Sequence, residues 1–329
     1  MKMKKIICLL LAFVLCFSLC ACKYKSPILS SDTSSLLTGN ESDSNEKSGP
    51  LLYKVTDKSG NVIWLFGSIH VGRDEFYPLP DYVLNAFDSA DKLAVEFDIV
   101  AYEQDVSLQT EALMAFVYKD GTTIKDHISE ELYNKAADIL KDANLYSSLY
   151  DYYNPALWTN LLDSILYEKI GANSELGIDR HLINKAYEVN KEIVDVESAK
   201  FQFEMLAGFS EELQIFLLNE TASAFDDADL MKNELAEMMD LWVSGDEKAF
   251  SEYLAAEENN IPKEETVLYE EYTKAMSTDR NASMTDFAED ALKSGEKIFM
   301  CVGSAHIVGE GAIAQNLKQK GYTVEIITK

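Results

Sequence analysis

Residues 64–72, WLFGSIHVG, and residues 300–309, MCVGSAHIVG, decide how this 329-residue chain folds. Each stretch is an apolar run that ends in Gly-Ser-x-His, with a further glycine close behind the histidine. A short apolar run of this kind, bounded by glycine, predicts a buried strand. Because functional residues gather beyond the carboxyl ends of strands in α/β sheets, we expect His70 and His306 to meet at one sheet edge.

Strand patterns lie mainly at the two ends of the body, and helical patterns lie between them. Strands are predicted at 51–56, 62–66, 92–97, 192–196, 297–302 and 322–327, and helices at 81–89, 154–170, 179–189 and 311–320. The last strand, helix and strand read as a βαβ unit. An apolar stripe of Met231, Leu235, Met238 and Trp242 is interpreted as core packing rather than as a peptide groove. We therefore predict an α/β (α+β) fold whose central sheet is built from both ends of the body, with a large helical insertion over about 100–292.

The composition describes an acidic globular protein. The chain has 56 Asp and Glu against 29 Lys and Arg, a net charge of −27, and 47% apolar residues. The apolar fraction is that of a chain with a packed core. Nucleic-acid binding requires clustered basic side chains, so nucleic acid is excluded as an expected partner.

The amino terminus is typical of a bacterial lipoprotein. Three lysines precede the apolar run 6–19, which ends in Leu19-Cys20-Ala21-Cys22. This pattern predicts a signal peptide at 1–21, lipidation of Cys22, a Ser-rich flexible tether at 22–50 and a folded domain at 51–329. The expected location is the cell membrane, lipid-anchored on its extracytoplasmic face. Plain secretion after Ala21 and an uncleaved anchor are the alternatives.

Histidine and carboxylate chemistry points to a metal site. Only Cys301 lies beyond residue 22, so the body has neither a disulfide framework nor a cysteine zinc site. His70 and His306 supply two imidazoles, and Glu96, which follows the apolar Leu93-Ala94-Val95, is the best third ligand. Asp98 is expected on the same side of that strand as a reserve ligand or a partner of the ligands.

Other histidines and serines have ordinary interpretations. His127 is expected in a loop and His181 in an amphipathic helix, and both are interpreted as packed structural side chains. A serine nucleophile is the rival chemistry, because Ser68 and Ser304 each precede a histidine by two residues. Neither serine has the Gly-x-Ser-x-Gly setting of a nucleophile elbow, and a triad would leave one histidine unused.

The two Gly-Ser-x-His segments, together with Glu96-Phe97-Asp98, resemble the TraB/GumN family, which includes relatives of the Tiki metalloproteases and is marked by two Gly-x-x-His motifs. Further similar segments are Gly177-Ile178-Asp179, Val196-Glu197-Ser198 with Gln202 shortly after, Arg280-Asn281, and the closing Gly321-Tyr322-Thr323-Val324. The resemblance extends over essentially all of residues 51–329. Val196 and Ser198 replace the usual Leu and Thr, and neither change removes a functional group.

The resemblance implies a metal-dependent hydrolase with His70, Glu96 and His306 as ligands. It implies manganese or cobalt, and the donor types suit zinc equally, so the cofactor is expected to be a divalent ion, Mn, Co or Zn. Four more residues are expected to contribute to catalysis through the resemblance: Arg280 and Asn281 near the site, and Glu197 and Asp179 as partners of the ligands or as acid/base groups. Each also has an ordinary interpretation, namely a helix-surface charge for Arg280, a helix cap for Asp179 and a solvent-facing carboxylate for Glu197.

Two functions from different classes remain open at this point. The first is a lipid-anchored extracytoplasmic metallohydrolase, most simply a peptidase acting on a peptide or protein substrate. The second is a non-catalytic protein that binds and sequesters a peptide or a signal molecule. A serine esterase comes third.

Overall fold

The structure is a computed structural model that describes residues 49–258 and 262–328. Its centre is a six-stranded sheet in the order β4-β3-β5-β2-β1-β6. The strands are β1 (Leu52–Thr56), β2 (Val62–Ser68), β3 (Lys92–Val95), β4 (Glu192–Asp195), β5 (Ile298–Gly303) and β6 (Thr323–Ile327). Strands β4, β3, β5 and β2 pair in parallel, whereas β1 is antiparallel to both β2 and β6. The predicted mixed α/β class is confirmed.

Both ends of the body contribute to the sheet, as predicted. Strand β5, from the carboxyl end, lies between β2 and β3, so that Phe299 is opposite Trp64 on one side and Leu93 on the other. Strands β5 and β6 run in the same direction, as a βαβ unit requires, but β2 and β1 lie between them. The predicted signal peptide and Cys22 lie outside the described residues, as does nearly all of the predicted tether.

Helices fill most of the chain between β3 and β5, where β4 is the one strand in the described residues. The helices up to the middle of the chain are α2 (Asp81–Ser89), α3 (Ile99–Gln104), α4 (Val106–Met114), α5 (Ile124–His127), α6 (Glu130–Asp142), α7 (Pro155–Ile170) and α8 (Ile178–Val189). The later helices are α9 (Ala199–Ala207), α10 (Glu211–Ala224), α11 (Ala228–Ser244), α12 (Glu247–Glu258), α13 (Thr266–Thr273), α14 (Asp279–Ser294), α15 (Ser304–Ile307) and α16 (Ile313–Gln319). A π-helical turn, Lys274–Thr278, joins α13 to α14.

Local sequence signals explain where these elements begin and end. The β1–β2 turn closes because the Asp57 carboxylate accepts the backbone N–H groups of Ser59 and Asn61, both at 2.8 Å. Helix α7 begins with an Asn154 cap and Pro155 in its first turn. It ends at Gly171, whose φ of 78° is the left-handed conformation that glycine adopts without steric cost.

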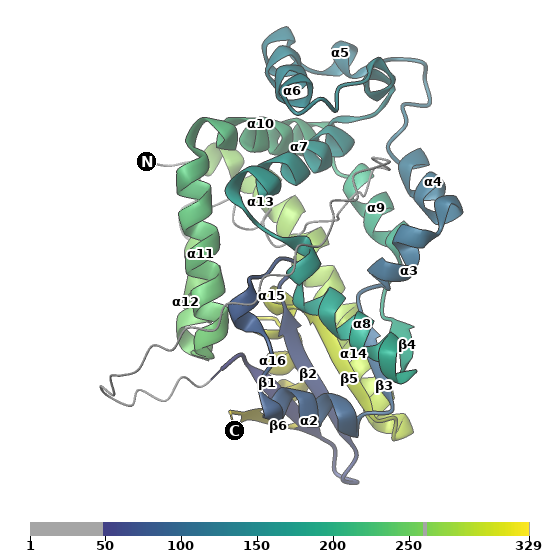
Figure 1. Cartoon of the computed structure of the whole chain (residues 1–329), viewed down its shortest axis with the longest axis vertical. Coiled ribbons are helices and arrows are strands. Elements are labelled where there is room, and N and C mark those ends of the chain that lie inside the picture. The colour runs from purple at the N-terminus through teal and green to yellow at the C-terminus, as the bar shows by residue number, and fades with distance from the viewer. Residues whose placement is uncertain (1–48, 259–261, 329) are drawn as a thin grey trace, which may run out of the picture.

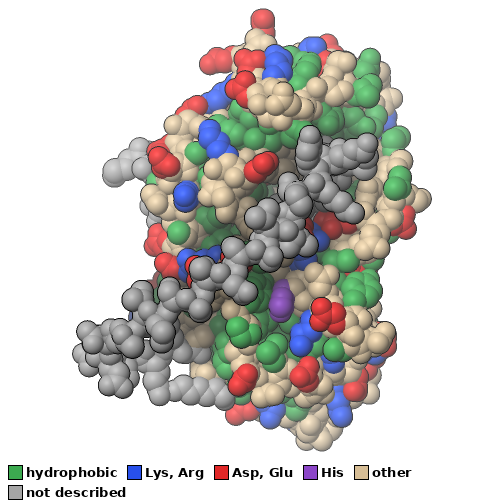
Figure 2. All heavy atoms as spheres, in the orientation of Figure 1, with side chains coloured by type: hydrophobic (Ala, Val, Ile, Leu, Met, Phe, Trp, Pro, Cys, Tyr) green, Lys and Arg blue, Asp and Glu red, His purple; other side chains and the backbone are tan. Residues whose placement is uncertain are grey.

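The sheet occupies one end of the molecule and most helices occupy the other. Figure 1 shows β1, β2, β5 and β6 in the lower half, with α5, α6, α7 and α10 at the top and α11 descending along one side. The stripe of α11 is buried in the main apolar core, as its spacing predicted. Figure 2 shows acidic and basic side chains interspersed among apolar ones on the visible face. No helix among the described residues is long and apolar enough to span a membrane.

Candidate functional site

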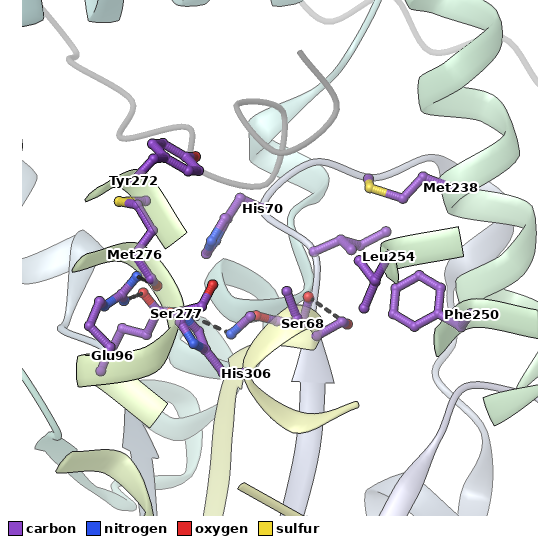
Figure 3. A pocket seen from close by; sticks show the side chains of 15 residues that line it. Ser68, His70, Glu96, Met238, Phe250, Leu254, Tyr272, Met276, Ser277 and His306 are labelled. Carbon is purple, nitrogen blue, oxygen red and sulfur yellow. Dashed lines mark hydrogen bonds and ion pairs between the residues drawn. The ribbon is translucent and has the colours of Figure 1, made fainter. Parts of the chain in front are cut away.

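Three parallel strands end beside one another and bring the predicted site together. His70 follows β2, Glu96 follows β3, and His306 lies in α15 directly after β5. All three side chains line one cavity of about 50 Å³. Figure 3 shows His70 above His306, with Glu96 to the left of His306. This meeting depends on β5 pairing with both β2 and β3, which places their carboxyl ends at one edge.

His70 is held by Asp179, which comes from the first turn of α8. The imidazole Nδ1 lies 2.8 Å from Asp179 Oδ2, and the His70 side chain is 17% exposed. Helix α8 can begin this close to His70 because residue 177 is glycine: a Cβ there would lie 2.6 Å from the His70 carbonyl oxygen. Burial lowers the pKa of His70, but the carboxylates of Asp179 and Glu96 outweigh it and raise this pKa to about 9.

His306 has a neutral partner instead. Its Nδ1 lies 2.7 Å from Asn281 Oδ1, and the Asn281 amide nitrogen donates to the Gly311 carbonyl, which fixes the orientation of the amide. The amide oxygen can only accept, so Nδ1 of His306 carries the hydrogen and Nε2 is free to act as a ligand. Burial and the charge of Arg280 lower the pKa of His306 to about 3.

Glu96 is fixed by a buried ion-pair network. Its Oε2 accepts from Arg280 at 2.6 Å and from Gln202 at 2.9 Å, and its Oε1 accepts from the backbone N–H of Gly303 at 2.8 Å. Arg280 and Gln202 also bind the Glu197 carboxylate, each at 2.8 Å. Burial alone would raise the pKa of Glu96, but Arg280 and the two nearby imidazoles hold it well below its usual range.

The network changes the expected roles of Arg280 and Glu197. The Arg280 side chain is only 1% exposed and lies between the two carboxylates, so it orients Glu96 and is not a free surface charge. The Glu197 side chain is 5% exposed and pairs with both nitrogens of Arg280 that face it. Glu197 is therefore neither solvent-facing nor free to act as a base. Its place beside Glu96 follows from β3–β4 pairing, which continues with Glu197 N–H donating to the Glu96 carbonyl at 2.8 Å.

One point in space is close to all three expected ligands. The position that a Cβ atom on Gly303 would occupy lies 3.2 Å from Glu96 Oε1, 3.5 Å from His306 Cδ2 and 4.0 Å from His70 Nε2. Glu96 Oε1 and His306 Nε2 are 4.0 Å apart. In residues 49–258 and 262–328, however, no three His, Cys, Asp or Glu side chains already form a group able to hold an ion.

The donor chemistry at this point nevertheless suits a divalent cation. Both imidazoles have Nδ1 anchored by an oxygen acceptor, the arrangement that leaves Nε2 as the ligand atom. Glu96 Oε1 receives a single hydrogen bond and keeps acceptor capacity on the side of His306, whose Nε2 lies 4.0 Å away. These side chains must move to close a complete ligand set around one ion.

The cavity has an apolar wall on one side and the α13–α14 junction on the other. Figure 3 shows Met238, Phe250 and Leu254 beyond one side of the histidines and Tyr272 and Met276 beyond the other. Tyr272 lies in α13 just before the π-helical turn, and Met276 lies within this turn, which precedes Arg280. Turns of this type are frequent at functional sites because they shift the register of one helix face against the next.

Several expectations for other residues are corrected by the structure. Asp98 caps α3, accepting from Ala101 N–H at 2.9 Å, and its other oxygen accepts from Tyr187, so it turns away from the ligands. His127 ends the short helix α5 rather than lying in a loop. His181 lies in α8 as expected, with its ring 4.3 Å from that of Tyr77.

The serine alternative finds no support in the hydrogen bonds of the described residues. Ser304 Oγ donates to the Ser68 carbonyl oxygen at 2.8 Å, and Ser68 Oγ is buried without a hydrogen-bond partner. Neither hydroxyl bonds to a histidine. Gln202, by contrast, joins Glu96 to Glu197, and the only signal for it in the sequence was its place in a family-like segment.

The fold and the paired histidine motifs agree with comparisons against known proteins. The model of the TraB/PrgY/gumN family matches residues 51–326. The chain therefore belongs to the TraB/PrgY/gumN family. It is similar to the uncharacterized protein YbaP of Escherichia coli (strain K12), with 26% identity over 256 residues, covering 77% of this chain and 87% of YbaP. The uncharacterized protein YbaP of Shigella flexneri matches with the same identity and coverage. No solved structure matches the chain.

Proposed function

We propose that the protein is a metal-dependent hydrolase, and specifically a peptidase, with a divalent ion bound between β2, β3 and β5. The observation that carries this proposal is the convergence of two histidines from opposite ends of the chain, each with Nδ1 anchored and Nε2 available. His70 and His306 would hold the ion together with Glu96 Oε1. A bound divalent ion polarises a scissile carbonyl and lowers the pKa of a coordinated water.

The surrounding side chains have defined tasks in this proposal. Asp179 and Asn281 orient the two imidazoles, and Arg280 orients Glu96 by binding the oxygen that faces away from the histidines. Because its pKa is held low, Glu96 stays anionic, which suits a ligand better than a proton acceptor. The apolar wall of α11 and α12 would bind an apolar part of the substrate.

The test is a joint measurement of bound metal and peptide hydrolysis. Protein purified without chelators or metal-affinity columns is subjected to elemental analysis and assayed on a fluorogenic peptide library with added manganese, cobalt or zinc. We expect His70→Ala and His306→Ala to lose metal and at least about a thousandfold in rate, because neither histidine alone holds the ion. His127→Gln and His181→Gln are the controls, and they should retain both.

Two results would overturn the proposal. One is full metal content and activity in both ligand variants. The other is a wild-type protein that hydrolyses no peptide with any of the three metals. If the wild type binds metal and peptides without cleaving them, the sequestering function takes its place.

We also propose that the protein acts at the extracytoplasmic face of the membrane, anchored by lipid at Cys22. The proposal rests on the basic and apolar leader followed by Leu19-Cys20-Ala21-Cys22. Cys22→Ala should release the protein from the membrane fraction or leave an unprocessed precursor, whereas Cys20→Ala should remain anchored. Unchanged processing and membrane association of Cys22→Ala would contradict it.

A further inference from the structure

A second cavity adjoins the candidate site. Tyr272 of α13 and Met276 of the π-helical turn line both cavities, so these two side chains lie at the boundary between them. The second cavity has a volume of about 30 Å³, room for one or two water-sized groups. Most of its wall is apolar, with Leu206 from the end of α9, Phe209 from the segment after α9 and Leu217 from α10.

Asp163 of α7 is the one charged side chain that lines this second cavity. Its Oδ1 accepts a hydrogen bond from the Thr221 hydroxyl at 3.1 Å, and no cationic side chain in the described residues pairs with it. The two other polar residues of α7 in the wall bond to their own helix: Thr159 donates to the Pro155 carbonyl and Asn160 to the Ala156 carbonyl. The carboxylate is therefore the one anionic group of this wall, and it has no charged partner in the described residues.

This arrangement leaves a carboxylate in a costly environment. Asp163 is only partly exposed, and this desolvation outweighs the hydrogen bond from Thr221 and raises the pKa of Asp163 to about 7. A purely structural link between α7 and α10 would need only a hydrogen-bond acceptor for Thr221, which an asparagine supplies without the cost of burying a charge. The packing of α7 against α10 therefore does not by itself explain why residue 163 is an aspartate.

We propose that the Asp163 cavity is a subsite for a primary ammonium group of the substrate, either a lysine side chain or the amino terminus of a peptide. This inference rests on the proposed peptidase function and names the substrate class that it favours. A small cavity with one carboxylate fits an ammonium group, which is a compact cation, better than the larger planar guanidinium of arginine. Apolar walls suit the methylene chain that carries a lysine ammonium group.

The subsite would work together with the apolar wall on the other side of the histidines. Figure 3 places Tyr272 and Met276 on the opposite side of His70 from Met238, Leu254 and Phe250. A peptide lying across the site would therefore present an apolar group to α11 and α12 and an ammonium group beyond Tyr272. The favoured substrate has these two features on opposite sides of the cleaved bond.

The experiment compares peptides that differ only in one charge. Lysine is replaced by norleucine, by acetyl-lysine or by arginine at each position of a cleaved sequence, and each peptide is made with a free and an acetylated amino terminus. We expect lysine, or the free amino terminus, to raise kcat/KM about ten- to hundredfold over its uncharged counterpart at one position, as for a hydrogen-bonded charge. Arginine should not reproduce the gain.

The variant Asp163→Asn assigns the preference to this cavity. Asparagine keeps an acceptor for the Thr221 hydroxyl, so the fold should remain intact, which the thermal midpoint of unfolding checks. The ratio of kcat/KM for the charged peptide to kcat/KM for the uncharged peptide should fall to near one. Asp138→Asn, which removes one negative charge from the exposed pair with Lys141 on α6, should keep the wild-type ratio. A preference that survives in Asp163→Asn, or a wild type that does not discriminate between the peptides, would overturn the inference.

A binding measurement separates this inference from the hydrolase proposal. Calorimetric titration of the lysine and norleucine peptides into His306→Ala, with and without Asp163→Asn, needs no turnover. If no peptide is cleaved by the wild type but the lysine peptide binds more tightly in an Asp163-dependent way, the peptidase proposal fails and the subsite stands. If the lysine and norleucine peptides bind equally well, the subsite proposal is wrong even if peptides are cleaved.

Discussion

The two Gly-Ser-x-His segments are nearly identical in sequence, and the structure gives their histidines opposite environments. His70 is partly exposed and faces the carboxylate of Asp179, whereas His306 is 7% exposed and faces the amide of Asn281. The pKa of His70 is raised to about 9 and that of His306 is lowered to about 3. The surroundings of each imidazole, rather than the motif itself, set its pKa: the Asp179 carboxylate raises that of His70, whereas burial and the charge of Arg280 lower that of His306.

This difference matters for the order in which the site is filled. In the metal-free protein at neutral pH, the raised pKa favours a cationic His70 with both ring nitrogens protonated, and the lowered pKa favours a neutral His306 with its hydrogen on Nδ1. His306 is ready to accept an ion through Nε2, while an ion arriving at His70 has to displace a proton. His306 is thus ready to bind a metal ion, whereas His70 must lose a proton to bind one.

The largest effect on stability is expected from removing Arg280, the cation that Glu96 after β3 and Glu197 after β4 share. Arg280→Met leaves Glu96 and Glu197 buried without their counter-charge, which should lower the free energy of unfolding by about 3–5 kcal/mol. Arg73→Met, which breaks an exposed pair with Asp240, is the control and should cost at most about 1 kcal/mol. Urea denaturation followed by circular dichroism measures both, and a loss below about 1 kcal/mol for Arg280→Met would contradict the buried network.

Exchanging the two partners is the direct test of the comparison. In metal-free protein, Asp179→Asn should lower the pKa of His70 by at least about one unit, because burial then acts without its opposing charge. Asn281→Asp should raise the pKa of His306 for the converse reason. Histidine resonances followed by NMR across a pH titration measure both values, and a His70 pKa unmoved by Asp179→Asn would show that the partner does not set it.

The same shifts fix how stability depends on pH in the metal-free protein. The raised pKa of His70 stabilises the fold below pH 6.5, and this contribution is lost as pH rises through about 9. The lowered pKa of His306 acts in the other direction, so stability falls as pH drops from 6.5 towards 3. Asp179→Asn should remove the loss of stability towards pH 9 and leave the loss of stability towards pH 3 in place.

The smallest effects are expected from alanine substitutions of Gly67 and Gly303, the first glycines of the two motifs, and the two variants should behave differently. A Cβ on Gly67 would lie 2.9 Å from the Ser304 Cα, so Gly67→Ala should destabilise the fold by about 1–3 kcal/mol through overpacking. A Cβ on Gly303 would enter the space among Glu96, His306 and His70 at 3.2 Å or more. Gly303→Ala should cost less stability than Gly67→Ala but reduce metal content. Elemental analysis and thermal unfolding distinguish these outcomes, and equal behaviour of both variants would contradict the assignment.

The sequence predicted the fold well where local patterns dominate. The β1–β2 hairpin, α2, α7 and the strand ends carry apolar periodicity together with turn or cap residues, and the structure has them within a few residues of the predicted bounds. The meeting of His70, Glu96 and His306 was predictable because parallel strands in one sheet end at one edge. The position of β5 between β2 and β3 was not, since spacing along the chain does not determine strand order.

The partners of the site residues were less accessible to sequence reasoning. Strand alternation put Asp98 beside Glu96, but the chain turns into α3 at once, and an aspartate at that point caps the helix instead. Glu197 reads as a carboxylate after a strand, and only the tertiary fold shows that Arg280, from a distant helix, binds it. Such long-range ion pairs leave no periodic signal.

The central position of β5 also determines when the molecule can fold as it is synthesised. Phe299 pairs with Trp64 and Leu93, so the middle of the sheet depends on contacts between residues made near the start and near the end of translation. Sheets built on such distant pairings close slowly, because a long loop must be ordered before any contact rewards it. Until Ile298–Gly303 emerges, β2 and β3 each present an unpaired edge, the kind of surface that invites aggregation or chaperone binding. A chain cut short before Ile298 therefore loses the strand that unites its sheet, as well as His306.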